Sequence, residues 1–391
     1  MKKFLQKRKE KRKEHKARHP ILFRILSVVL IIALLVGAYI SYAVIYRGKT
    51  EGHVHSKTTS TEPVLHNDTK SLKRALTMYP ALKKAVFSQS DLSSLPNAYV
   101  IPGLDSVRTL RTTEDGTTKK ATCKSMTPQG MAVTPNYIII SGYCHVGKHN
   151  SVLLVIDKTT GEFLKEIVLQ GTPHAGGIAY DPLNDMLWIS SGSSGIASIA
   201  AIPVSYLINY DIDAKEPIAY LYEYPIVTLQ SASFICYYDK CIYVGLFSRK
   251  NTGAIYRYGI NEDGTLASTP VTTTVSQTYK EIARPDSVTI IEDKIQGLAM
   301  NDDYQFESES WGCVPSEIFV HAQTDDIVSV FNSDNVLFTG TYPRMLEQIC
   351  LDGNDMYLLF ESAAYAYRYY PLVGMDYILR VDISTFIEAL S

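Results

Sequence analysis

Two glutamates in the stretch QFESESWG, Gln305 to Gly312, have a type and spacing suited to acid–base chemistry. Residues two apart in a strand point to the same face, which places the carboxyl groups of Glu307 and Glu309 roughly 6.6 Å apart along the strand. That separation is close to the one used by two carboxylates that hydrolyse a glycosidic bond. Two solvated residues at a strand edge would show the same spacing, so both interpretations stay open.

Other residues have side chains suited to ligand contact. Trp311 follows Glu309 on the same face, where its ring could stack on a sugar or a peptide. His174 lies among small residues in GTPHAGGIAYD, either as an acid–base group or as a hydrogen-bonded structural histidine. The stretch FESAAYAYRYYPLVGMDY carries Tyr365 and Tyr367, whose rigid amphipathic rings suit recognition of carbohydrate or protein and equally suit a packed core.

No pattern in the sequence predicts a metal or a cofactor. His145 and His149 are four apart, but they follow a strand in a loop rather than sharing a helix face. The acidic turns MNDDY and LDGND lack the full pattern of a calcium-binding loop. Hydrolase, zinc-protease and nucleotide-binding fingerprints do not occur in a supporting context. We therefore expect no metal site and no cofactor.

Five similar units position the candidate residues. They begin near Gly130, Gly177, Ser233, Gly297 and Glu347, at intervals of 47, 56, 64 and 50 residues. Each unit has a small or polar start, a short apolar strand, a turn and a second strand. Self-similarity at such a period, all in strands, is typical of a β-propeller with about four strands in each blade. We predict an all-β fold, a five-bladed β-propeller, with a long β-sandwich as the alternative.

The last unit is short of one outer strand, because only TFIEALS follows DYILRVDIS. The segment NAYVIPGLDSVRTLR, which precedes the first unit, could supply that strand and so close the ring.

A propeller binds ligands at one mouth of its channel, among residues that precede the innermost strands and follow the second strands. Fold-level analogy thus brings together Gln129, His174, Ser231, Gln296, Arg344, Glu347, Ser141, Ser190, Glu307, Glu309 and Glu361. The catalytic candidates are Glu307, Glu309 and His174, and the ligand-binding candidates are Gln129, Gln296, Trp311, Arg344, Glu347, Glu361, Tyr365 and Tyr367.

The units resemble those of secreted YncE-like β-propellers and of the plant-type glutaminyl cyclase family. Gln296-Gly297-Leu298 followed by Glu307-Ser308 matches part of a cyclase pattern, and Gln129-Gly130 matches its beginning; Ser310 and Trp311 depart from it. The architecture also looks like that of membrane-anchored proteins of Gram-positive bacteria. The cyclase resemblance implies an acid–base role for Glu307.

The charge is divided between two parts of the chain. Residues 1–24 carry 11 Lys/Arg and 2 Asp/Glu, and the remaining 27 basic and 38 acidic residues give a net charge of -11. Residues 25–46 hold no charge over 22 residues, enough to cross a bilayer core. The positive-inside rule predicts a cytoplasmic N-terminus and an extracellular C-terminal domain, and an uncleaved anchor is favoured over a cleaved signal peptide. An acidic body argues against nucleic acid as a partner.

The sequence therefore predicts a basic cytoplasmic tail (1–24), a transmembrane anchor (25–46), a stalk with a short helical collar (47–92) and an extracellular propeller (93–391). All six cysteines follow the anchor, which favours disulfides, with Cys236 and Cys241 close enough across a turn to pair and the other pairings open. Buried thiols are the alternative.

The favoured function is binding of a cell-envelope ligand, either a glycan, a wall peptide or a partner protein. The alternative is an enzyme with Glu307 as acid or base, which cyclises N-terminal glutamine or cleaves a glycan by hydrolysis or elimination. A structural subunit of a membrane complex is a third possibility.

Overall fold

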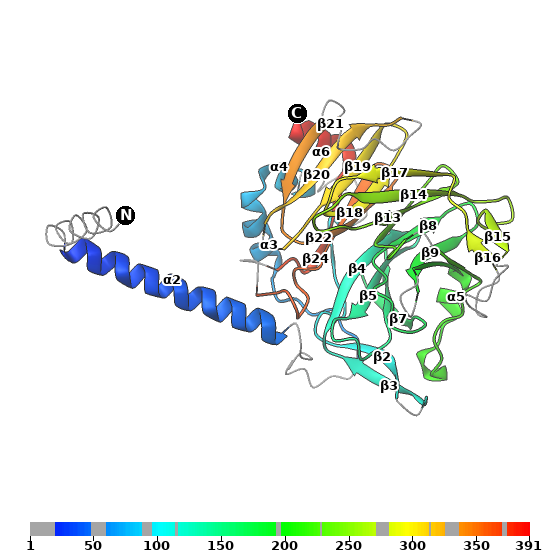
Figure 1. Cartoon of the computed structure of the whole chain (residues 1–391), viewed down its shortest axis with the longest axis horizontal. Helices are drawn as coiled ribbons and strands as arrows, with labels where there is room; N and C mark the ends of the chain where they lie inside the picture. Colours follow the sequence, from blue (N-terminus) through cyan, green and yellow to red (C-terminus); the bar gives the residue numbers. More distant parts are fainter. Residues whose placement is uncertain are drawn as a thin grey trace, which may run out of the picture. The chain divides into compact units, whose positions relative to one another are not determined.

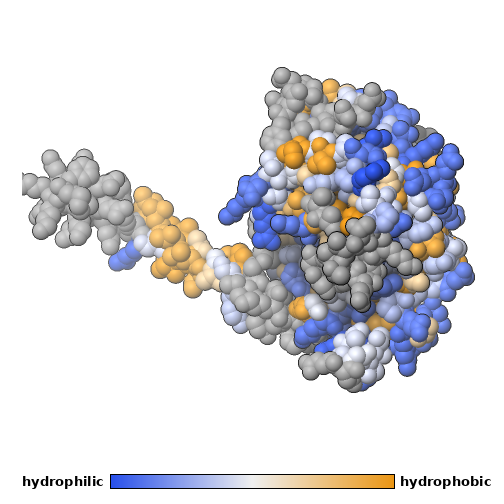
Figure 2. All heavy atoms as spheres, turned by 45° about the vertical axis from the view of Figure 1, so that its right-hand side comes forward, coloured by the Kyte–Doolittle hydropathy of each residue, from blue (hydrophilic) through white to orange (hydrophobic). Residues whose placement is uncertain are grey.

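The computed structural model describes residues 20–47, 60–87, 96–113, 116–192, 197–226, 229–270, 281–312, 314–324, 336–369 and 374–391. The chain forms two compact units, residues 1–49 and 50–391. The first holds helix α2 (Pro20–Arg47), and its stretch Arg24–Tyr42 is long and apolar enough to span a membrane. Its apolar side chains form the orange surface of that helix in Figure 2. This is the segment in which the sequence predicts an anchor.

The second unit is a five-bladed β-propeller (Figure 1), as the sequence predicts. The blades are β4–β7 (Met126–Val133, Tyr137–Cys144, Val152–Asp157, Phe163–Val168), β8–β11 (Ile178–Asp181, Met186–Ser191, Ser198–Pro203, Tyr222–Pro225), β12–β14 with β17 (Phe234–Tyr238, Cys241–Leu246, Gly253–Gly259, Ser287–Ile291), β18–β21 (Ile295–Met300, Tyr304–Glu309, Ser316–Ala322, Val336–Tyr342), and β22–β24 with β1 (Leu346–Asp352, Asp355–Phe360, Tyr377–Asp382, Ala98–Val100).

The five inner strands form a closed ring in which β4, β8, β12, β18 and β22 each pack against the next and β22 returns to β4. Every pair of neighbouring blades encloses its own cluster of buried apolar side chains. Close approach at the ring requires glycine: a Cβ on Gly177 would lie 2.4 Å from the main-chain nitrogen of Ile235 in the next blade. The glycines that begin the repeats therefore serve strand packing.

Insertions explain the uneven spacing of the repeats. The hairpin β15–β16 (Ser268–Pro270 and Glu281–Ala283) lies between β14 and β17 and lengthens the third unit. Helix α5 (Val204–Asn209) and the 3-10 turn η2 (Ile212–Ala214) lie between β10 and β11 and lengthen the second. A further hairpin, β2–β3 (Val107–Thr112 and Thr118–Cys123), precedes the first blade, and in Figure 1 both hairpins lie at the margin of the propeller.

Helices cover the blades formed by β18–β21 and by β22–β24. The predicted collar consists of α3 (Thr69–Ala75), the 3-10 turn η1 (Leu76–Met78) and α4 (Pro80–Phe87). The helical segment is interrupted next to Pro80, because proline has no main-chain N–H to continue a helix from the preceding turn. The chain ends in α6 (Ile383–Leu390), which Asp382 caps by accepting a hydrogen bond from the Thr385 amide. The collar and α6 pack into one core with these two blades. The stalk residues 48–59 lie outside the described part of the chain.

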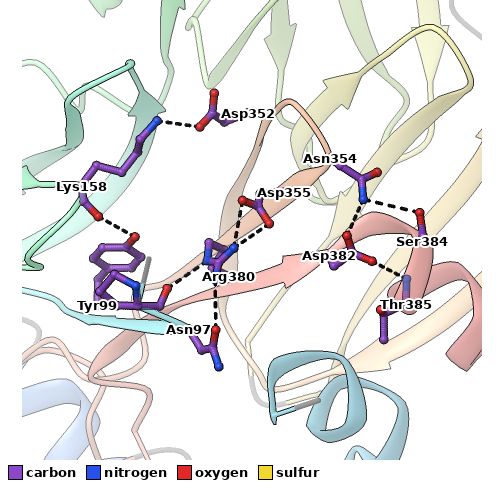
Figure 3. A network of polar contacts seen from close by, with 11 residues as sticks. Asn97, Tyr99, Lys158, Asp352, Asn354, Asp355, Arg380, Asp382, Ser384 and Thr385 are labelled. Atoms are coloured by element: carbon purple, nitrogen blue, oxygen red, sulfur yellow. Dashed lines mark hydrogen bonds and ion pairs between the residues drawn. The ribbon is translucent and has the colours of Figure 1, made fainter. Parts of the chain in front are cut away.

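The ring closes as the sequence predicts, because β1 pairs with β24 and completes the last blade. The buried Arg380 of β24 holds this junction (Figure 3). Its Nη1 donates to both carboxylate oxygens of Asp355, at 2.9 and 3.0 Å, and its Nε donates to the main-chain oxygen of Pro96 at 3.0 Å. Tyr99 of β1 donates its hydroxyl to the main-chain oxygen of Lys158 at 2.8 Å, which links the junction to the first blade.

The prediction of disulfides is wrong for the described cysteines, since no disulfide joins any of Cys123, Cys144, Cys236, Cys241 and Cys350. Cys241 lies opposite Tyr238 across the β12–β13 ladder, and Cys236 lies opposite Tyr243. Cys236 and Cys241 are therefore diagonal neighbours, roughly 7 Å apart, whereas a disulfide needs Cβ atoms about 4 Å apart. Cys313 lies outside the described residues.

Replacing Arg380 tests the closure. We expect Arg380→Met to lower the free energy of unfolding by about 3–5 kcal/mol, because it leaves the half-buried Asp355 carboxylate and the Pro96 carbonyl without their donor. The measurement is urea unfolding of the full-length chain in detergent. Tryptophan fluorescence is the signal, since Trp188 and Trp311 are the only tryptophans.

The matched control is Lys120→Met, which removes a pair with Asp213 in which both side chains are exposed. Water screens such a pair, so this variant should unfold at nearly the wild-type urea concentration. Equal losses in the two variants would contradict the closing role of Arg380.

Candidate functional site

A cavity of about 620 Å³ opens where the inner strands begin and the second strands end. It is lined by Gln129, Tyr143, His145, His174, Gly176, Ser231, Ala232, Ser233, Phe247, Arg249, Gln296, Ser310, Trp311, Gly312, Met345, Glu347, Glu361 and Tyr367. All five blades contribute to this wall. The cavity therefore lies at the mouth of the channel and is large enough for a small organic ligand.

Two carboxyl groups of the last blade meet at this cavity. Glu347 belongs to β22, Glu361 directly follows β23, and their side chains are hydrogen-bonded to each other. Burial raises the pKa of Glu361 to about 7, and burial together with the neighbouring Glu361 charge raises the pKa of Glu347 well above its usual range. Burial favours the protonated form of both groups, and because each affects the other they titrate as one coupled pair.

An amide and an imidazole extend this pair. Gln129 Nε2 donates to Glu361 Oε2 at 2.8 Å and to the main-chain oxygen of Pro128 at 2.9 Å. The amide oxygen of Gln129 then faces His174 Nε2. An amide oxygen only accepts, so His174 donates from Nε2 and its Nδ1 carries no proton when the ring is neutral. Glu361, Gln129 and His174 thus form a continuous hydrogen-bonded chain along the wall.

Aromatic rings line the same side of the cavity. The Tyr143 ring lies 4.1 Å from the His174 ring, centroid to centroid, and the Tyr143 hydroxyl is 3.0 Å from His145 Nδ1. Tyr367 approaches His145 edge-on at 5.3 Å. Burial lowers the pKa of His145, which favours a neutral ring at pH 7. This wall offers π-faces and hydroxyl groups beside the carboxyl pair.

The third and fourth blades supply a second polar and aromatic cluster. The Arg249 guanidinium lies 4.6 Å from the centre of the Trp311 ring, and Phe247 lies 5.8 Å from that ring. Trp311 is 41% exposed, although it is a large apolar side chain. An exposed tryptophan held by two neighbours is a ready stacking surface, and the arginine adds a fixed positive charge.

Gln348 links the inner strands of the propeller. Its Nε2 donates to the main-chain oxygens of Met131 at 2.8 Å, Ile178 at 2.7 Å and Ile235 at 3.2 Å, and its Oε1 accepts from the Met131 amide at 3.1 Å. One buried side chain thus joins β22 to β4, β8 and β12. A smaller cavity of about 70 Å³, which includes Gln348, shares no lining residue with the mouth cavity. The two cavities are therefore lined by separate sets of residues.

The structure places most of the predicted site residues in this cavity. Gln129, His174, Gln296, Trp311, Glu347, Glu361 and Tyr367 line it. Sequence reasoning did not select Tyr143, Phe247, Arg249 and Gln348. Tyr143, Phe247 and Arg249 lie at or just after the end of a second strand, the same position from which Glu361 was selected. Gln348 has a signal of its own, a long polar side chain inside an apolar inner strand.

Four predicted site residues lie elsewhere. Glu307 has no exposed surface and lies between sheets, with its Oε2 3.6 Å from Nε2 of the equally buried His321. Glu309 is half-buried at the end of β19, 3.6 Å from the Lys294 ammonium. Tyr365 is buried beneath the Arg368 guanidinium. Arg344 is half-buried outside the cavity lining, near Tyr79 of the collar, where burial raises the pKa of Tyr79 and the Arg344 charge partly opposes that rise.

No protein-family model and no curated protein matches the chain. Among solved structures, the glutaminyl cyclase of Myxococcus xanthus is similar, with 10% identity over 73% of this chain and 95% of that chain, at a TM-score of 0.38. A structure of the nidogen/laminin complex shows 11% identity over 65% and 84% of the two chains, at 0.33. Hydrazine synthase of Kuenenia stuttgartiensis shows 12% identity over 65% and 86%, at 0.31. At such values these similarities say nothing about activity, and the five-bladed fold rests on the strand pairing described above.

Proposed function

We propose that the chain is a single-pass membrane protein with its propeller outside the cell, where the mouth cavity binds an amine-bearing ligand of the cell envelope. A wall peptide and an amino sugar both fit this description. The basic residues 1–24 beside the apolar helix α2 support a cytoplasmic N-terminus. A partner protein would bind in the same way, by placing one of its amino groups in the cavity.

The carboxyl pair is the observation that carries the proposal. Glu347 stays protonated while Glu361 loses its proton near pH 7, so above that pH the pair holds one negative charge in a cavity walled by tyrosine and histidine rings. A buried charge without a counter-charge is costly, and an ammonium group entering the cavity would remove that cost. The faces of Tyr143 and Tyr367 would add cation–π attraction to the same group.

Trp311 and Arg249 extend recognition beyond the amino group. Their exposed, stacked arrangement suits the face of a sugar ring or a planar peptide group. The guanidinium suits a carboxylate or phosphate on the same ligand. A ligand with both an ammonium group and an anionic or ring-bearing part therefore matches the cavity at two places.

The carboxyl pair also supports a second candidate function, acid–base catalysis. Two carboxyl groups that share a proton provide an acid and a base in one site. In cyclisation of an N-terminal glutamine, the α-amine would form a bond to the side-chain carbonyl carbon as that carbon loses ammonia. Glu361 would take the proton from the amine, and Glu347 would give its proton to the leaving ammonia. The carboxyl pair would thus replace the buried Glu307 as acid and base, and the same pair could serve elimination across a glycan. Two carboxyl groups in direct contact are too close for glycan hydrolysis, which uses a separation of at least about 5 Å.

A thermal-shift screen with a mass readout separates the two functions. Full-length protein in detergent is mixed with wall peptides, amino-sugar oligomers or peptides that begin with glutamine. A binding protein should show a higher melting temperature with every ligand mass unchanged. An enzyme should convert a glutamine peptide to a product lighter by one ammonia, or shorten a glycan. No shift and no conversion with any amine-bearing compound would contradict both functions.

Two variants locate the binding site. We expect Glu361→Gln and Trp311→Ala each to weaken binding at least about tenfold, because one removes the charge and the other the stacking surface. Glu309→Gln is the matched control, since Glu309 is a half-buried glutamate outside the cavity. Binding that survives in both cavity variants but falls in the control would place the site elsewhere.

The raised pKa of Glu361 makes a separate prediction for stability. The pKa of Glu361 is raised from about 4.5 to about 7 in the folded chain, so between these values the folded state binds more protons than the unfolded state. The contribution of Glu361 to the free energy of unfolding must therefore fall as the pH rises through this window. We expect Glu361→Gln to flatten that fall, measured by urea unfolding at pH 5, 6, 7 and 8.

The control for this series is Glu388→Gln, which changes an exposed glutamate of α6 and should keep the wild-type slope. A Glu361→Gln variant with the same slope as wild type would rule out the raised pKa of Glu361.

A further inference from the structure

A second cluster of reactive side chains lies outside the mouth cavity. Cys123 ends β3, Cys144 ends β5 and His149 lies in the loop that follows β5. Their ligand atoms, two Sγ atoms and one imidazole nitrogen, all lie within 4.8 Å of one another. The three residues are 0%, 3% and 5% exposed. None of them lines the mouth cavity.

The local structure explains why these residues meet. Neighbouring strand residues point to opposite faces, so Tyr143 faces the cavity and Cys144 faces the core between blades. After β5 the chain turns sharply at Gly147, whose φ of 69° and hydrogen bond from its amide to the Cys144 carbonyl close a tight turn. This turn brings His149 back, so that its Nδ1 lies 3.3 Å from Cys144 Sγ.

The β2–β3 hairpin supplies the third ligand and holds the loop. The Asn150 amide donates to the main-chain oxygen of Leu110, and the Thr109 hydroxyl donates to the main-chain oxygen of Asn150 at 2.8 Å. Leu110 and Thr109 belong to β2, which pairs with β3 and so fixes Cys123 opposite Val107. Three backbone segments therefore position the cluster before any ion is bound.

We propose that Cys123, Cys144 and His149 bind one thiophilic metal ion with a filled d shell, Zn²⁺ or Cu⁺. Thiolate and imidazole are the ligands that such ions prefer. In a tetrahedral zinc site, bond lengths of about 2.3 Å to sulfur and 2.0 Å to nitrogen separate the two ligand atoms by roughly 3.5 Å. The 3.3 Å between Cys144 Sγ and His149 Nδ1 is close to that separation.

Main-chain amide groups face both sulfur atoms. The Ser125 amide donates to Cys123 Sγ at 3.4 Å, and the Lys148 amide donates to Cys144. Such amide donors stabilise the negative charge that a metal-bound sulfur carries. Binding of the ion would release the two thiol protons. A disulfide between the two cysteines would use the same sulfurs but would give no role to the buried His149.

Zn²⁺ and Cu⁺ differ in how many ligands they need beyond the three that the cluster supplies. No fourth Cys, His, Asp or Glu of the described residues belongs to the cluster. Three ligands complete a trigonal site for Cu⁺, whereas Zn²⁺ would keep a fourth position for water or for another small ligand. Expression in zinc-supplemented and in copper-supplemented medium therefore gives two arms of one experiment.

The test is metal analysis of full-length protein purified in detergent without chelators. We expect about one zinc or copper ion per chain in wild type, and at least a tenfold lower content in Cys144→Ser and in His149→Ala. Cys241→Ser is the matched control, because Cys241 is a buried thiol outside the cluster, and it should keep the wild-type content.

A measurement on wild type alone covers the case in which the variants fail to fold. Removing the ion with a chelator should lower the melting temperature, and adding Co²⁺ should produce sulfur-to-cobalt charge-transfer absorption. Three results would overturn the proposal: wild type without metal in both arms, a peptide joined by a disulfide between Cys123 and Cys144, or an unchanged metal content in His149→Ala.

Discussion

A single buried glutamine side chain joins the inner strands on which the rest of this propeller is built. Gln348 of β22 binds main-chain groups of three other inner strands, so it ties four of the five blades together at the point where they come closest. Buried amide groups are stable only when their hydrogen bonds are satisfied, and here both ends of the side chain find main-chain partners. The inner strands are therefore joined by one side chain at the level of the small cavity that Gln348 lines.

The same strand, β22, also carries Glu347 of the carboxyl pair. The β22–β23 ladder shifts its register between Leu346 and Ile349, which turns Glu347 toward the mouth while Gln348 crosses the axis. Glu361 reaches the same place from the end of β23, so the carboxyl pair comes from one blade. This is the blade that β1 completes and Arg380 holds closed. Closure of the ring and placement of the acidic pair therefore depend on the same sheet.

Much of the fold follows from local sequence patterns, and the site follows only in part. The five units and the outer strand from the N-terminal side are predictable, because strand alternation and turn residues are short-range signals. Glu307 shows what such local patterns cannot predict. Both faces of a blade pack against neighbouring blades, so period-two spacing says that Glu307 and Glu309 share a face but not that this face is buried. A side chain reaches the channel mouth from a strand end, as Glu361 does, and strand ends are the least predictable feature of a sequence.

The cysteines also show that local sequence patterns do not predict which side chains meet in space. An even count after an apolar segment indicates disulfides, yet pairing depends on which strands become neighbours in space, and this ladder places Cys236 and Cys241 on a diagonal. Cys123 and Cys144 meet because a hairpin inserted before the first blade folds against the loop after β5. That loop carries both His145 on the cavity wall and His149 in the cluster. The contacts that fix His149 therefore also limit how far His145 and Tyr143 can move. These contacts come from the β2–β3 hairpin, which is not part of any of the five repeats.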